Sequence, residues 1–233
     1  MMNWLNKLLS PSSDPLAKKL HSILGFTPKR IALYHQALCH SSIDMPIYGN
    51  NERLEFLGDS ILNSVITEYL FYKLPNKNEG VLTDIRSKLV SRKTLNQLAI
   101  KFEMDSLVQT NVGGKIPSSI YGNAFEALIA AIYLDKGNKF CNRFIVKKII
   151  EPHFSLKTLE QEISSYKKHF IHWAQKNSKT YSFKLLGETG ESHKKDFKIG
   201  LFLNEKSIAT AHASSKKKAE EATAKIACKT LNL

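Results

Sequence analysis

The sequence predicts an all-α domain followed by a small α+β domain whose elements run in the order α-β-β-β-α. Through the first two thirds of the chain, apolar residues recur at intervals of three and four, as on the buried face of a helix. In the last third they alternate with polar residues, as in half-buried strands, before a final helical stretch. Pro152 and the polar run that follows it place the boundary at residue 155.

The first domain is built from segments with helical spacing. The second of its two long helices, over 121–134, is apolar on nearly all sides, which is typical of a helix buried among other helices. Weaker helical patterns cover 15–24, 29–38, 82–102 and 139–150. The other long helix has apolar residues at Leu54, Leu57, Ile61, Leu62, Val65, Ile66, Tyr69 and Leu70.

The second domain begins with a helix over 163–176. Alternation predicts strands around 181–185, 197–203 and 207–211. Ser214 or Ser215 then caps a last helix. We expect its apolar face to consist of Ala219, Ala222, Ile226, Ala227 and Leu231.

The composition indicates an intracellular protein with a polyanionic partner. The 233 residues carry a formal net charge of +13, and residues 156–233 hold 15 lysines against 8 acidic residues. This excess attracts nucleic acid or an acidic membrane surface. No run approaches the roughly 18 apolar residues of a membrane span. The three cysteines are far apart without metal-site spacing, so we expect reduced, packed thiols in a cytoplasmic protein.

Three carboxylates in the segment 51–62 fall on one helix face. At about 100° per residue, Glu52, Glu55 and Asp59 lie within roughly 60° of one another. Like charges at these spacings repel, so the cluster requires a compensating cation. Arg53, or a lysine from elsewhere, would make it an ordinary salt-bridge network, whereas a divalent ion would make it a functional site.

The helix over 121–134 offers two further oxygen donors. Asn123 and Glu126 lie one turn apart among small or apolar residues, where an unpaired carboxylate is unfavourable. If the two long helices pack together, Glu55, Asp59, Asn123 and Glu126 converge as an all-oxygen site of the kind that Mg²⁺ or Mn²⁺ prefers. Such an ion polarises phosphoryl oxygens, which favours phosphodiester hydrolysis. A purely structural ion network remains the alternative.

The run 51–62 resembles the signature of the ribonuclease III family, and the last third resembles that family's double-stranded-RNA-binding domain. The resemblance spans about residues 15–233. It implies a helical endonuclease domain over 1–155, with 1–14 as a loose extension, and an RNA-binding domain over 156–233. It also implies a homodimer with one acidic metal site in each subunit. Each site would cut one strand, leaving 5′-phosphates and short 3′ overhangs.

The resemblance assigns roles to individual acids by position. Glu55 and Asp59 match metal ligands of the first helix, and Glu126 matches the essential glutamate of the second. Asp59 and Glu126 are therefore the expected catalytic residues. Glu52 and Glu79 match auxiliary acids that lie near the site and the RNA in the family.

Two further positions bear on this site. Many family members have aspartate where this chain has Asn123, which keeps a carbonyl oxygen but removes one negative charge. We therefore expect Asn123 to remain a metal ligand and the metal affinity to be lower. Gly58 has the small size that close helix packing requires.

The basic residues of the tail match the RNA-binding part of the resemblance. Three lysines fall in the first turn of the last helix, where the backbone amides also favour phosphate. A lysine triplet alone is usually a solvated surface, but here it follows three predicted strands and a capping serine. This arrangement is typical of a domain that spans RNA minor grooves. The expected RNA-binding residues are His193, Lys194, Lys195, Lys216, Lys217 and Lys218.

The leading hypothesis is a homodimeric endoribonuclease that hydrolyses double-stranded RNA with Mg²⁺, for which Mn²⁺ could substitute. Its expected role is the processing and turnover of rRNA and mRNA, with no membrane partner and no small-molecule cofactor. The alternative is a non-catalytic double-stranded-RNA-binding scaffold, such as a ribosome-associated relative. Both models predict salt-sensitive duplex binding, so only a cleavage assay separates them.

Overall fold

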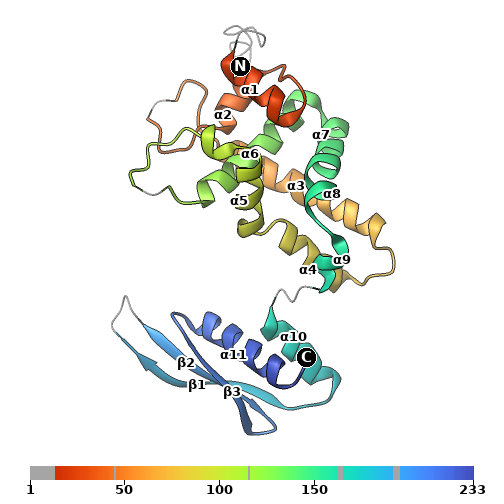
Figure 1. The fold of residues 1–233 in the computed structure, drawn as a ribbon, viewed down its shortest axis with the longest axis vertical. Coiled ribbons are helices and arrows are strands. Elements are labelled where there is room, and N and C mark those ends of the chain that lie inside the picture. Colours follow the sequence, from red (N-terminus) through yellow and green to blue (C-terminus); the bar gives the residue numbers. More distant parts are fainter. Residues whose placement is uncertain (1–13, 45, 115, 162–164, 191–194) are drawn as a thin grey trace. The chain divides into compact units, whose positions relative to one another are not determined.

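The computed structural model describes residues 14–44, 46–114, 116–161, 165–190 and 195–233. The chain forms two compact units, Met1–Glu160 and Gln161–Leu233 (Figure 1). The division lies five residues after the boundary expected at 155. All but the last residue of a short helix, α9 (Leu156–Gln161), belong to the first unit, because Leu159 is buried in that unit's core and its carbonyl accepts a hydrogen bond from Lys88 Nζ.

The described part of the first unit is helical, as the apolar spacing predicted. No helix of the described chain is both long and apolar enough to cross a membrane. Cys39 and Cys141 are buried free thiols, as is Cys228 in the second unit, which confirms the expected packing of the cysteines. Besides α9 the elements are α1 (Pro15–Leu24), α2 (Ile31–Ala37), α3 (Glu52–Lys73), α4 (Glu79–Leu89), α5 (Arg92–Lys101), the 3₁₀ turn η1 (Met104–Ser106), α6 (Ser119–Lys136), α7 (Asn138–Phe144), the π-helical turn η2 (Ile145–Ile150) and α8 (Glu151–His153).

The helical pattern over 82–102 is divided between two helices, because the chain turns between α4 and α5. Ser91 adopts an extended conformation, and its hydroxyl accepts a hydrogen bond from the Thr94 amide. Thr94 Oγ1 also lies 2.6 Å from the Lys88 carbonyl oxygen and satisfies the open end of α4. Hydrogen bonds at the end of α4 and at the start of α5 therefore separate two helices that share one apolar periodicity.

Helix α6 lies inside the first unit and packs against α2, α3, α5 and α7 (Figure 1). Its residues 127–132 are all buried, which confirms the prediction of a helix that is apolar on nearly all sides. The two long helices, α3 and α6, pack directly against each other. Every acidic residue on the inner face of α3 is thus held close to α6.

The second unit consists of α10 (Tyr166–Lys176), β1 (Tyr181–Thr189), β2 (Asp196–Leu203), β3 (Lys206–Ala213) and α11 (Lys216–Thr230). The strands form one antiparallel sheet in the order β1-β2-β3. Its core joins Phe170 of α10 to Leu201 of β2 and Ala224 of α11. Ser215 caps α11 by accepting a hydrogen bond from the Lys218 amide. The predicted order α-β-β-β-α is confirmed.

The apolar face expected for the last helix is partly wrong. Ile226 is 44% exposed, and the buried face instead includes Thr223. The threonine is accommodated because its hydroxyl lies 2.7 Å from the Ala219 carbonyl oxygen and 3.1 Å from that of Ile199. A buried polar group with satisfied hydrogen bonds is compatible with a core, which apolar spacing alone does not reveal.

Candidate functional site

An acidic cavity of about 580 Å³ lies between α3, α5 and α6. Helix α3 contributes Glu52, Glu55 and Asp59 to it, and α6 contributes Asn123 and Glu126. The two helix faces that the spacing singled out therefore meet at one cavity. Its full lining consists of Glu52, Glu55, Phe56, Asp59, Val90, Arg92, Leu95, Asn96, Gly122, Asn123 and Glu126.

Gly58 sets the distance between the two acidic helices. A Cβ atom at this position would lie 1.7 Å from the carbonyl oxygen of Glu126 and 3.3 Å from the amide nitrogen of Ala130. Only glycine allows the backbones of α3 and α6 to approach so closely. Asp59 and Glu126 face the same cavity because the backbone of Gly58, next to Asp59, packs directly against the carbonyl group of Glu126.

The cavity destabilises the negative charge of Glu126. Burial raises the pKa of this carboxyl to about 7, and the negative charges of Asp59 and Glu55 contribute to the increase. The positive charge of Arg92 opposes the shift without abolishing it. A divalent cation in the cavity would supply the missing positive charge.

Burial also raises the pKa of Glu55, with a further contribution from the charge of Glu52. A side-chain hydrogen bond from Asn123 acts in the opposite direction, as do the positive charges of Arg92 and His40. Asn123, as a potential hydrogen-bond donor near Glu55, therefore favours the ionised form of that carboxyl. An aspartate at position 123 would offer no such donor and would repel Glu55.

The donor set suits a hard divalent cation, because every donor is a carboxylate or amide oxygen. Within the described chain, however, no three His, Cys, Asp or Glu side chains are gathered closely enough to hold an ion. Asp59 is turned along its own helix, where its Oδ1 accepts a 2.7 Å hydrogen bond from Asn63 Nδ2. The residues fit a metal in their chemistry and share one cavity, and binding would require the carboxylates to move toward the ion.

Glu79 is the predicted acid of the first unit that is not part of this cavity. Glu79 begins α4 and accepts a 2.8 Å hydrogen bond from Thr83 Oγ1, and it is not among the lining residues. His193 and Lys194 lie outside the described residues. Lys195 is exposed and pairs with Glu188 at 2.6 Å.

The lysine triplet stands in the first turn of α11, as expected. Lys216 Nζ lies 5.7 Å from the centre of the Phe197 ring, a cation–π contact that directs this side chain over β2. Lys217 and Lys218 are exposed. The first turn of α11 therefore presents a concentrated positive charge at a helix N-terminus, where the helix dipole is also positive.

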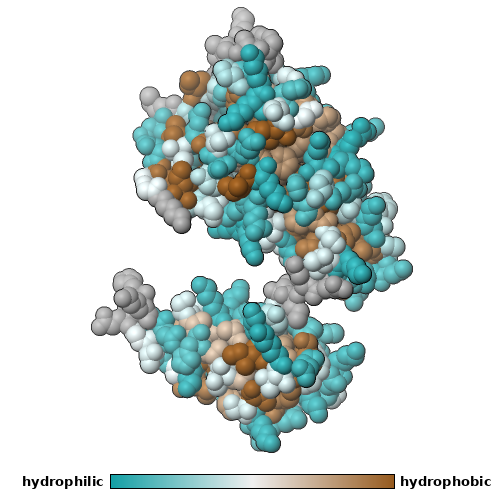
Figure 2. Space-filling model, viewed as in Figure 1, coloured by the Kyte–Doolittle hydropathy of each residue, from teal (hydrophilic) through white to brown (hydrophobic). Residues whose placement is uncertain are grey.

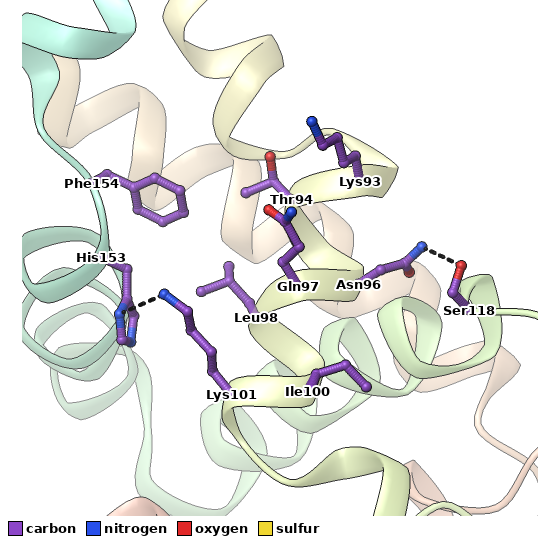
Figure 3. Close-up of a pocket in the computed structure, with 10 residues that line it drawn as sticks. All are labelled: Lys93, Thr94, Asn96, Gln97, Leu98, Ile100, Lys101, Ser118, His153 and Phe154. Carbon is purple, nitrogen blue, oxygen red and sulfur yellow. Dashed lines mark hydrogen bonds between the residues drawn. The ribbon is translucent and has the colours of Figure 1, made fainter.

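A larger cavity of about 890 Å³ lies on another side of α5 (Figure 3). Leu98, Ile100 and Phe154 form its apolar part, while Lys101 Nζ lies 3.5 Å from His153 Nδ1. Its described lining contains no carboxylate. Asn96 contributes to both cavities and separates them.

Two polar residues that line the acidic cavity, Arg92 and Asn96, were not expected from the sequence. Arg92 is an exposed cation at a helix start, and no periodicity distinguishes it from other surface charges. Asn96 packs against α6 so closely that a Cβ atom at Gly122 would lie 2.4 Å from its Oδ1. A capping serine at position 91, three residues before Thr94, was a signal for the start of α5, but it does not indicate that α5 packs beside α6.

Comparison with known proteins is consistent with this architecture. A family model described as Ribonuclease-III-like matches residues 30–153, and a double-stranded RNA binding motif matches residues 166–231. The chain belongs to the ribonuclease III family. It is 45% identical over 213 residues to Ribonuclease 3 of Zunongwangia profunda, covering 88% of this chain and 87% of that relative. It is 39% identical over 214 residues to Ribonuclease 3 of Flavobacterium psychrophilum, covering 89% and 86%.

Solved structures place the first unit in the same ribonuclease III family. The nuclease domain of ribonuclease III from Campylobacter jejuni is 36% identical, with a TM-score of 0.53, over 57% of this chain and 94% of that one. The expected family, fold class and enzyme class are thereby confirmed. The relatives are named as ribonucleases, so they give no support to a non-catalytic scaffold.

Proposed function

We propose that this chain hydrolyses phosphodiester bonds of double-stranded RNA at the acidic cavity, using Mg²⁺ or Mn²⁺. One observation carries the proposal: a ribonuclease III fold brings Glu55, Asp59, Asn123 and Glu126 to a single cavity, where the charge of Arg92 only partly offsets the carboxylates. Asp59 and Glu126 are the proposed catalytic residues. Glu52 lies at the same cavity as an auxiliary acid, while Glu79 would act from outside it.

The side chains of the cavity have separate tasks in this proposal. Glu55, Asp59, Asn123 and Glu126 would hold the divalent ion through oxygen atoms. Once bound, the ion would stabilise negative charge that develops on the phosphate and activate water for attack. The hydrogen bond from Asn63 holds Asp59 along α3, and binding of the ion would replace this contact.

The second unit would bind the duplex by its shape and phosphates. The A-form major groove is too narrow for side chains to read, so contacts fall on phosphates and 2′-hydroxyls. Lys216, Lys217 and Lys218 supply the positive charge for this contact at the start of α11. We propose that His193, Lys194 and Lys195, which lie between β1 and β2 in the sequence, contact the minor groove.

We further propose that the protein acts as a homodimer in rRNA and mRNA processing. The side chain of Phe56 is 78% exposed at the edge of the acidic cavity, so its apolar ring is available for contact with a second copy of the chain. Hydrophilic residues dominate the surface in Figure 2, and apolar residues show through in separate patches. In the Campylobacter jejuni nuclease domain, a structurally flexible region is involved in dimer formation. Two sites, each cutting one strand, would leave 5′-phosphates and short 3′ overhangs.

A cleavage assay tests the proposal. Purified protein is incubated with a long RNA duplex in Mg²⁺, in Mn²⁺, and in excess chelator. We expect short duplex fragments with either metal and intact RNA with chelator. A duplex that remains intact at saturating protein in both metals would contradict the proposal and favour the scaffold.

Replacing Asn123 with aspartate should increase the metal affinity of the site. The change adds one negative charge to the donor set, and ligand charge is a main determinant of divalent-ion affinity. We expect the Mg²⁺ concentration for half-maximal cleavage to fall by roughly 3- to 10-fold. Asn138→Asp, an exposed position at the start of α7, makes the same charge change away from the cavity and should leave this concentration unaltered. An unchanged requirement in Asn123→Asp would argue against Asn123 as a ligand.

A further inference from the structure

Arg92 is the one basic side chain among the described residues that line the acidic cavity. It is exposed, and no hydrogen bond or ion pair joins it to another described residue. Nevertheless, its positive charge acts to lower the pKa of both Glu55 and Glu126. The cavity therefore contains a guanidinium group that is close to the carboxylates without being bound by them.

The start of α5 holds this arginine in place. The Ser91 and Thr94 hydroxyls lie 2.7 Å apart, and Thr94 is bonded in turn to the last turn of α4. Leu95, which follows one turn later, is buried with 4% of its surface exposed. The backbone at Arg92 is thus anchored on both sides, while its side chain keeps its freedom to meet a ligand.

We propose that Arg92 is a substrate-binding residue whose guanidinium contacts a phosphate of the RNA strand that enters the acidic cavity. The inference rests on the proposed function and names a further residue for the same site. A strand approaching this cavity meets several carboxylates that repel it, so a fixed cation at the rim lowers the cost of approach. Guanidinium binds phosphate through two parallel hydrogen bonds, which also orients the strand.

A purely structural role for Arg92 fits the contacts less well. An arginine that served only to balance the acids would be expected to form an ion pair with one of them. Arg92 forms none with a described residue, although Glu55 and Glu126 line the same cavity. Its hydrogen-bond donors thus remain available to an incoming anion.

Lys93 provides a matched control. It is the next residue of the same helix, is also exposed and carries the same charge, but it lines the larger cavity instead (Figure 3). Replacing either residue with glutamine changes the net charge equally. A difference between the two variants therefore reports position and not overall charge.

The first experiment measures duplex binding by the full chain in the Glu126→Gln background, in chelator, across a series of salt concentrations. We expect Arg92→Gln to weaken binding by roughly 5- to 10-fold and to reduce the salt slope by about 1 for each phosphate contact removed. Lys93→Gln should change affinity by less than about 2-fold, and Arg92→Lys should restore part of the loss. Affinity and salt slope in Arg92→Gln that equal those of Lys93→Gln would overturn the inference.

The second experiment measures cleavage kinetics with Glu126 intact. Loss of a phosphate contact should raise KM by about the factor found for binding, while kcat changes little. A structural counterion would instead lower the thermal midpoint and leave KM unchanged, which would count against the inference. If the wild-type chain binds duplex but never cleaves it, the proposed function fails, and the binding series still decides the role of Arg92.

Discussion

Replacing Glu126 with glutamine should reduce metal-dependent cleavage of duplex RNA by roughly 10³-fold or more while leaving duplex binding intact. Glutamine has nearly the same shape, so it fills the same space against α3, but it removes a negative charge from the proposed metal site. Single-turnover cleavage at saturating protein measures the loss, and binding of the uncleaved duplex in chelator measures what is retained. Cleavage at the wild-type rate in Mg²⁺ would contradict the assignment of Glu126.

The same variant should be more stable than the wild type when no metal is present. The folded protein raises the pKa of Glu126 from 4.5 to about 7, so between these pH values the folded state holds more protons than the unfolded state. Stability of the wild type therefore falls as pH rises through this window. Because the carboxyl is partly solvated, we expect a gain of about 1–2 kcal/mol for Glu126→Gln at pH 8 in chelator, and none at pH 4.

Urea unfolding at the two pH values tests this expectation. Glu68→Gln is a suitable control, because Glu68 is an exposed residue of α3 outside the acidic cavity. The Glu68→Gln variant should show no pH-dependent increase in its free energy of unfolding. A Glu126→Gln protein that is less stable than the wild type at pH 8 would mean that the folded chain already balances this charge without a metal ion.

The acidic part of the site could be predicted because helical geometry is local. The spacing of Glu55 and Asp59 fixes their common face on α3, and the spacing of Asn123 and Glu126 does the same for α6. The contact between these faces is part of the tertiary structure. Gly58 nevertheless indicates it, because a side chain at this position would overlap the backbone of α6. The small and apolar residues of α6 give a second signal for burial on all sides.

The rest of the site depends on contacts that no local pattern reveals. Arg92 belongs to a short helix whose direction is set by the turn at Ser91, and the apolar periodicity runs through that turn without a break. Thr223 lies in a core because two carbonyl oxygens accept its hydroxyl hydrogen bond, one of them from a different element. The Ile199 carbonyl oxygen is remote in sequence from Thr223, and the turn before Arg92 is hidden by a continuous apolar pattern.

Replacing Gly58 with alanine should destabilise the first unit by about 3 kcal/mol or more and reduce cleavage along with it. The new Cβ atom would lie 1.7 Å from the Glu126 carbonyl oxygen and 2.5 Å from its carbonyl carbon. Both are backbone atoms of a buried helix, so no side-chain rotation relieves the overlap, and α3 must move away from α6. That movement opens a core whose contacts extend along both helices. Chemical denaturation of the full chain measures the loss.

Gly80→Ala is the matched control for this effect. Gly80 is also a helical glycine, but a Cβ atom there would meet only the Asn78 side-chain oxygen, at an ordinary 3.5 Å. Alanine favours helix more than glycine does, so this variant should match the wild type or gain up to about 1 kcal/mol. At a temperature where Gly58→Ala is still folded, its cleavage rate should remain low, because the separation of α3 from α6 displaces Asp59 from Glu126. A Gly58→Ala protein with wild-type stability and activity would show that the two helices need not touch for the acids to act together.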